Sequence, residues 1–198
     1  MTWEQNIMQS DLVSDGYLSG KLLISAPSMG DSRFNRALIY ICSHSDGGAM
    51  GLIVNQVIQD FPLSKMAEEI GVSWNDNFAS INVLCGGPVE SSRGFILHSA
   101  DYQVKGSLAV NDDVVLSATI EVVEAITQGL GPKNFIVALG YTGWGEGQLE
   151  QEIKEDSWLC AAADNNLLWI EEPHLKWDMA LKKLGVNPNV LVTQSGNV

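Results

Sequence analysis

The irregular order of strand-like and helix-like segments limits the possible folds of this chain more than any other feature. The strand-like segments are short, apolar and partly β-branched, and turn-forming residues such as glycine, proline and aspartate separate them. They cover residues 17–24, 36–43, 51–55, 81–85, 94–98, 107–110, 135–141 and 167–170. Helical patterns interrupt this series without a strict strand–helix alternation. That order favours an α+β fold with a mixed, largely antiparallel sheet over a doubly wound parallel fold.

Turn and capping residues define several of these elements further. The Ser-Asp-Gly-Gly sequence at residues 45–48 predicts an antiparallel hairpin between the second and third strands. Pro62 and Pro173 each suit the first position of a helix, and Gly185 follows the apolar stripe that Pro173 begins. The predicted helices cover residues 1–16, 62–70, 120–130 and 173–184.

The length of 198 residues is enough for one substantial core, and no repeat, low-complexity tract or linker divides the chain. We therefore predict a single domain over residues 1–198, with its core at about 16–185. No apolar run approaches the roughly 20 residues of a membrane-spanning helix. The first residues also lack the basic and apolar regions of a secretion signal. We expect a cytoplasmic protein with no membrane partner.

The charge balance argues against direct binding to nucleic acid. Eleven Lys and Arg residues against 24 Asp and Glu residues give a formal net charge of −13. Such a surface repels DNA unless its cations gather on one face, and most of them lie far apart in the sequence. Lys176, Lys182 and Lys183 come nearest to a cluster. We interpret them as residues that complement the dipole at the end of one helix.

Cysteine and histidine offer one possible reactive or metal-binding group. Cys42, Cys85 and Cys160 lie far apart, which favours reduced, buried thiols over a disulfide framework. Cys42 and His44 are two residues apart on a predicted strand, so their side chains would share a face. Together with Cys85 and His98 they would form a metal site or a thiolate–imidazole pair. The simpler interpretation is a buried cysteine beside a turn histidine, and we predict no metal.

Residues 140–149, Gly-Tyr-Thr-Gly-Trp-Gly-Glu-Gly-Gln-Leu, form a glycine-rich segment between a predicted strand and a helix. Backbone N–H groups in such a place bind phosphate in many proteins. This segment has no Lys or Arg, however, and Glu146, Glu150 and Glu152 would repel an anion. The alternative is that the glycines supply positive φ angles and close packing around Trp144.

Three arginines are the remaining candidates for a polar site. Arg33 and Arg36 lie beside Asp31, and Arg93 lies between the Gly-Gly-Pro turn at 86–88 and a strand. Guanidinium groups bind carboxylates and phosphates, but these three would equally pair with local acidic residues. No Ser-His-Asp order, paired carboxylates or nucleophile elbow stands out, so we assign no catalytic residue and no cofactor.

Several of these motifs occur in the same order as in one known family, and together they cover about residues 16–185. The chain resembles the YqgE/AlgH family. The resemblance is carried by Leu-Ile-Ser-Ala-Pro-Ser-Met-Gly-Asp at 23–31 with Phe34, His-Ser-Asp-Gly-Gly-Ala-Met-Gly-Leu-Ile-Val-Asn at 44–55, Gly-Gly-Pro-Val at 86–89, Arg-Gly-Phe-Ile-Leu-His at 93–98 and the segment 140–150. One departure is Ser43, which stands where such proteins often carry Glu.

The resemblance implies a compact α+β fold whose bent sheet wraps into a barrel-like core with flanking helices. It brings no catalytic residues, and the family's function is essentially unassigned. One family name comes from a proposed regulator of alginate synthesis genes, so the resemblance implies a transcriptional role.

Three functions therefore stay open: a small-molecule- or protein-binding module with an indirect regulatory role, an enzyme acting on a small anionic metabolite, or a DNA-binding regulator. The first is favoured, because the glycine- and aromatic-rich loops suit recognition and no catalytic set is complete. For a pocket, we expect contributions from the segments 26–36, 86–88 and 143–145. The oligomeric state is not predicted. The candidate ligand-binding residues are Asp31, Arg33, Arg36, His44, Gly86, Gly87, Arg93, His98 and Trp144.

Overall fold

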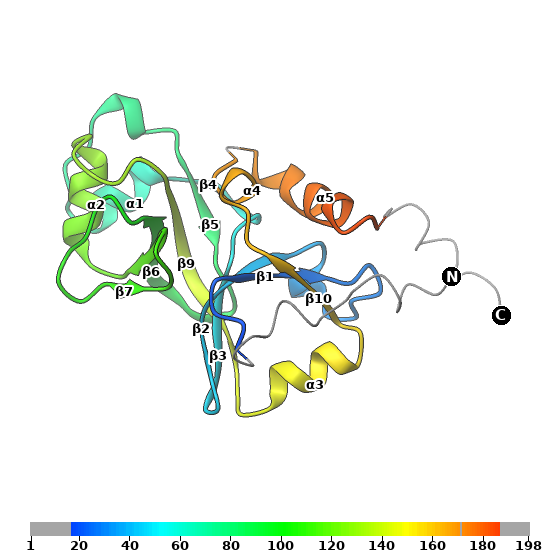
Figure 1. Cartoon of the computed structure of the whole chain (residues 1–198). Helices are drawn as coiled ribbons and strands as arrows, with labels where there is room; N and C mark the ends of the chain where they lie inside the picture. Colours follow the sequence, from blue (N-terminus) through cyan, green and yellow to red (C-terminus); the bar gives the residue numbers. More distant parts are fainter. Residues whose placement is uncertain (1–16, 171, 187–198) are drawn as a thin grey trace.

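The computed structural model describes residues 17–170 and 172–186, which form one ten-stranded sheet flanked by helices (Figure 1). The helix expected over residues 1–16 lies outside the described part. The strands are β1 (Lys21–Ser25), β2 (Leu38–Ser45), β3 (Gly48–Ile53), β4 (Val57–Pro62), β5 (Asn82–Cys85), β6 (Val89–Ser99), β7 (Leu108–Ala109), β8 (Val114–Ser117), β9 (Phe135–Trp144) and β10 (Trp158–Ala162). The helices are α1 (Leu63–Glu69), α2 (Ile120–Thr127), α3 (Gln148–Lys154), α4 (Asn165–Leu168) and α5 (Pro173–Lys183).

Strand β9 connects the two parts of the sheet. Its last residues pair with β3, and its first half pairs with β6 along one edge and with β5 along the other. The β5–β9 pair is parallel, and the other pairs between described strands are antiparallel. The sheet curls into a half-barrel, so the predicted α+β class with a mixed, largely antiparallel, bent sheet is confirmed.

Three apolar clusters hold the helices against the sheet. One face of the β5–β9–β6 region packs against α1 and α2 through residues such as Leu63, Val123 and Val137. Helix α5 packs on β1 and β2, and its Trp177 joins a larger cluster that also contains the opposite face of the β5–β9–β6 region. Helix α3 covers the far side of the β2–β3 hairpin through Leu149. Figure 1 shows α1 and α2 at one end of the molecule, α5 over the sheet and α3 beside the hairpin.

The elements with strong local signals form as predicted. Strands β2 and β3 make the antiparallel hairpin at residues 45–48. Pro173 occupies the first turn of α5, and Gly185 follows its end with a φ of +71°. Gly71, with a φ of +73°, follows α1 in the same way. A glycine adopts this left-handed conformation without the Cβ clash that other residues incur.

Two sequence-based assignments were wrong or incomplete. The strand predicted at 167–170 is instead the short helix α4, in which Asp164 caps the N-terminus by accepting a hydrogen bond from the Asn166 N–H. Its Leu167 and Leu168 are buried, so a short apolar run that suits a strand equally suits a buried helix turn. Strands β4, β8 and β10 were not predicted.

Two adjacent glycines let the chain cross β9 in a tight step. Cys85 pairs with one edge of β9, and Val89 pairs with Tyr141 on the opposite edge. A Cβ on Gly87, whose φ is +152°, would lie 2.2 Å from the Tyr141 backbone carbon. A Cβ on Gly86 would lie 2.3 Å from the Gly140 oxygen. Contacts this short are not tolerated, so the crossing requires glycine.

None of the described helices combines the length and the apolar character that crossing a bilayer requires.

Candidate functional site

A shallow hollow of about 670 Å³ lies where the β2–β3 hairpin, the end of β9 and the start of β6 meet. All four strands contribute to it, so it forms only once the sheet has curled. The residues that line it are Ser43, Ser45, Gly47, Gly48, Ala49, Met50, Val89, Arg93, Phe95, Tyr141, Gly143 and Trp144. Most of them belong to four of the five sequence motifs that carry the resemblance to the YqgE/AlgH family. We call this region the hairpin hollow.

Aromatic side chains and one cation give the hairpin hollow its chemistry. The rings of Phe95 and Tyr141 meet edge to face with centroids 5.7 Å apart. The Arg93 guanidinium lies 5.1 Å from the Phe95 ring centroid and donates a hydrogen bond of 2.9 Å to Glu90. Both partners of this ion pair are about half exposed, so the pair is weak and Arg93 stays accessible. Arg93 is the one charged residue among those that line the hollow.

The hollow borders an open edge of the sheet. Thr142, Gly143 and Trp144 pair with β3 along one edge of β9. Along the other edge, the ladder with β6 ends at the Tyr141–Val89 pair. Backbone N–H and C=O groups of a strand point alternately to its two edges. Among the described residues, β9 therefore has polar backbone groups without a strand partner at the rim of the hollow; of its last three residues Gly143 is exposed, whereas Thr142 and Trp144 are buried.

Trp144 forms part of the floor of the hollow, but its ring packs mainly against residues on the other face of the sheet. Its residue exposure is 7%, and its ring meets Trp158 at a centroid distance of 6.0 Å. The indole Nε1 atoms of both tryptophans donate to the same Glu152 oxygen, at 2.9 and 2.8 Å. Gly48 allows this arrangement, because a Cβ there would lie 2.2 Å from the Trp144 carbonyl oxygen. These contacts support the architectural interpretation of the glycine-rich segment.

His44 lies on the opposite face of the hairpin from the hollow. A β-bulge between Ile41 and Ser43 adds one residue to β2, so Cys42 and His44 do not share a face. Cys42 belongs to the cluster that contains Tyr40, whereas His44 is opposite Ala49 in another cluster. The alternative of a thiol–imidazole pair between Cys42 and His44 is therefore wrong. Burial raises the pKa of the Cys42 thiol to about 12, so it stays protonated.

The contacts of His44 fix its tautomer. Nδ1 accepts a hydrogen bond of 3.0 Å from the backbone N–H of Leu18, so Nε2 carries the proton of the neutral ring. Nε2 lies 2.7 Å from a Glu150 carboxylate oxygen and donates to it. The Tyr17 ring packs against the imidazole edge to face. This His–Glu pair joins the hairpin to α3.

Asp31, Arg33 and Arg36 lie elsewhere, at the start of β2 and beside α5. Asp31 accepts hydrogen bonds from the Arg33 side chain and backbone, which hold the pKa of the Asp31 carboxyl below its usual value. Arg36 pairs with Asp178 and lies over the Trp177 ring at 4.4 Å. Arg33 and Arg93 thus pair with acidic residues nearby in sequence, as the simpler interpretation predicted, whereas Arg36 pairs with an aspartate on α5 that is distant in sequence.

His98 is buried in the sheet. Its Nε2 lies 2.8 Å from the Ser117 hydroxyl, and its Nδ1 lies 3.0 Å from the Ser99 carbonyl oxygen, to which it donates. Burial lowers the pKa of the imidazole. Asp31, Arg33, His44 and His98 do not line the hairpin hollow.

Among the described residues, the structure brings Arg93 and Trp144 together at the hairpin hollow and leaves the other candidate residues apart. Gly86 and Gly87 pack against the β9 backbone nearby. The segments 26–36 and 86–88 do not line the hollow, whereas Gly143 and Trp144 do. Sequence reasoning missed Tyr141 and Met50. Both stand inside the family motifs. For Tyr141, an aromatic residue beside Gly140 was the available signal.

The fold and the hollow define a class of half-barrel α+β proteins with an open sheet edge. The AlgH-like family profile matches residues 22–189. The chain is 43% identical over 192 residues to a UPF0301 protein of Bradyrhizobium diazoefficiens, covering 93% of this chain and 90% of that protein. It is 40% identical over 183 residues to a UPF0301 protein of Rhodospirillum rubrum, covering 92% and 95%. This chain therefore belongs to the AlgH-like family.

Solved structures agree with this assignment. The solution structure of the AlgH protein from Pseudomonas aeruginosa superposes with a TM-score of 0.76 at 33% identity, covering 93% of this chain and 98% of that one. A Corynebacterium diphtheriae protein shares the fold alone, with a TM-score of 0.67 at 19% identity over 88% of this chain and 91% of that one. No specific function is established for these relatives.

Proposed function

We propose that this protein is a binding module that recognises an extended segment of a partner protein at the hairpin hollow. The observation that carries the proposal is the exposed Gly143, on the edge of β9 that β6 leaves unpaired beyond Tyr141, beside a concave surface with aromatic side chains. An extended peptide adds a strand to such an edge, and its alternate side chains enter the neighbouring hollow. Gly143 is exposed and has no side chain, so its backbone at this rim is accessible.

The composition of the hollow favours one kind of segment. Backbone pairing requires a polypeptide, because a small molecule does not repeat N–H and C=O groups at strand spacing. Tyr141 and Met50, which are partly exposed, offer contact area to an apolar side chain. Arg93 favours a carboxylate on the partner segment. Such a preference is unusual for a chain whose own formal net charge is −13. The partner segment is thus extended, apolar and acidic.

The other two functions have less support. An enzyme acting through Asp31, Arg33, His44 and His98 would need these residues around one cavity, and they make separate local contacts. Direct DNA binding is opposed by the net negative charge of the chain, which repels the DNA phosphates. Our proposal therefore includes an indirect regulatory role, in the cytoplasm, through the partner protein. The proposal also treats the chain as a single domain, because the described strands form one continuous sheet.

Peptide selection tests this function. A random peptide library is displayed on phage and selected on the full chain, and a selected peptide is titrated by fluorescence anisotropy. We expect Tyr141→Ala and Arg93→Ala to weaken its binding at least tenfold. Arg33→Ala is the matched control, since Arg33 is also exposed and ion-paired but lies outside the hollow, and it should bind normally.

The backbone contribution has its own control. Methylation of alternate peptide nitrogens removes the donors that face β9 in one register, so one of the two alternately methylated peptides should lose binding. The proposal fails if selection yields no binder, or if both methylated peptides and both hollow variants bind as well as their parents.

A further inference from the structure

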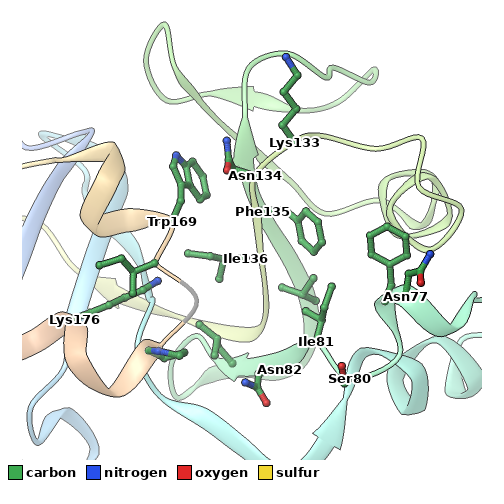
Figure 2. Close-up of a pocket in the computed structure, with 15 residues that line it drawn as sticks. Asn77, Ser80, Ile81, Asn82, Lys133, Asn134, Phe135, Ile136, Trp169 and Lys176 are labelled. Carbon is green, nitrogen blue, oxygen red and sulfur yellow. The ribbon is translucent and has the colours of Figure 1, made fainter.

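A second cavity, separate from the hairpin hollow, lies between α5 and the start of β9. Its volume is about 470 Å³, which falls within the range of small-molecule pockets. Figure 2 shows Lys176 and Trp169 on one side of it and Asn134, Phe135 and Ile136 on the other. It is also lined by Asn77, Phe78, Ser80, Ile81, Asn82, Leu84, Lys133, Val137, Ile170 and Pro173. We call it the Lys176 pocket.

Lys176 is the unusual residue in this pocket. It is only 1% exposed, although lysine is rarely buried without a partner of opposite charge. Its Nζ donates a hydrogen bond of 2.7 Å to the Leu168 carbonyl oxygen at the end of α4. No carboxylate of a described residue forms an ion pair with it. Burial lowers the pKa of the ammonium to about 8, so it is mostly charged at neutral pH.

The position of Lys176 is fixed by its helix. Lys176 and Ala180 are four residues apart on α5, and both are buried. The neighbouring Trp177 anchors the helix, because its Nε1 donates to the Ser25 carbonyl oxygen at 3.1 Å. Arg36 covers the Trp177 ring from outside. The ammonium therefore keeps its place at the wall of the pocket, ready for a ligand.

We propose that the Lys176 pocket binds a small monocarboxylate with a flat apolar body. The ligand's carboxylate would supply the counter-charge that the buried ammonium lacks among the described residues, in a site where charge interactions are stronger than in water. The side-chain amides of Asn82 and Asn134 offer further hydrogen bonds. Phe135, Trp169 and Ile136 offer apolar contact to the rest of the ligand.

Two features favour a monocarboxylate over a phosphate. The pocket has one buried cation, whereas a phosphate carries close to two charges and requires several donors. Half of the wall is aromatic or aliphatic, which suits a ligand with an apolar body. The second lysine of the wall, Lys133, is exposed, and Figure 2 shows its side chain directed away from Lys176.

Matched probes test this inference on the full chain. Benzoate and indole-3-acetate are titrated by calorimetry and by thermal shift, beside benzamide, which has nearly the same shape as benzoate without charge, and inorganic phosphate. We expect the two carboxylates to bind and to raise the melting temperature by mass action. Benzamide and phosphate should bind at least tenfold more weakly.

Two variants and a pH series locate the site. Lys176→Met keeps the length of the side chain without its charge and should weaken carboxylate binding at least tenfold, whereas Lys133→Met should leave it unchanged. Because Lys176 and Lys133 are the titratable residues among those that line the pocket, binding should weaken about tenfold between pH 7 and pH 9 as the Lys176 ammonium deprotonates.

Several results would overturn the inference. These are equal binding of benzoate and benzamide, undiminished binding by a folded Lys176→Met, or no binding of either carboxylate at millimolar concentration. If Lys176→Met does not fold, the pH series on the unaltered chain decides: binding that stays constant from pH 7 to pH 9 refutes a role for the ammonium. The peptide experiment at the hairpin hollow is independent of every one of these outcomes.

Discussion

Replacing Trp144 by alanine tests whether the glycine-rich segment is architectural. Trp144 is 7% exposed, and its ring packs against Trp158 in the cluster that joins the hairpin to α3. Removing a buried tryptophan side chain costs about 3–5 kcal/mol. The lost hydrogen bond to Glu152 adds about 1 kcal/mol, and the carboxylate keeps its second donor, Trp158. We expect Trp144→Ala to lose roughly 4–6 kcal/mol of the free energy of unfolding.

Urea unfolding, followed by circular dichroism, measures this loss. With an m-value of about 2 kcal/mol/M, the expected loss lowers the midpoint by about 2–3 M. Trp144→Phe is the matched control, because it keeps an aromatic ring and removes the indole N–H; we expect it to cost about 1–2 kcal/mol.

The opposite outcome would refute the reasoning. If Trp144→Ala changes the free energy of unfolding by less than about 1 kcal/mol while abolishing peptide binding, Trp144 is a recognition residue and not part of the architecture.

Three further predictions follow from the structure. Gly87→Ala should cost more than about 3 kcal/mol in urea unfolding because its Cβ would collide with Tyr141, whereas Gly71→Ala, at positive φ in open space, should cost about 1 kcal/mol; equal costs would contradict the tight crossing. Because the pKa of Lys176 is lowered by folding, the unfolded chain binds more protons than the folded chain between pH 8 and 10.5. The free energy of unfolding of the unaltered chain, relative to that of Lys176→Met, should therefore rise by about 3 kcal/mol across that window. A difference that stays constant with pH would show that the ammonium is solvated. The isolated protein should show no sequence-selective DNA binding in a mobility-shift assay at physiological salt, and submicromolar binding would show that the charge argument is wrong.

Local signals account for the parts of the fold that the sequence predicted. The hairpin at 45–48, the proline that begins α5 and the glycines that end α1 and α5 each act within a few residues. A structure-wide property such as the half-barrel came from the family resemblance, because sheet curvature depends on strand pairs distant in sequence. Strand β10 was missed for the same reason, since it pairs with β1 across the length of the chain.

The site was harder to predict than the fold. The i, i+2 rule placed Cys42 and His44 on one face, and a bulge that has no sequence signature separated them. Arg93 and Trp144 were identified as candidates, but they lie close together only because the chain crosses β9 at Gly86 and Gly87. Lys176 was interpreted, with Lys182 and Lys183, as complementing the dipole at a helix end, which is wrong for Lys176, because it lies near the start of α5 and is buried. Its position four residues before Ala180 on the apolar stripe was a signal of burial.

The most direct test of the central claim is an NMR titration of the full, ¹⁵N-labelled chain with a selected peptide. Binding by strand addition at the open edge of β9 predicts that the largest amide shift changes fall on residues 142–144, Tyr141 and Arg93, with intermolecular contacts between the peptide backbone and Gly143. Changes centred on α5 and the Lys176 pocket, or spread without contacts to β9, would contradict recognition at the hairpin hollow.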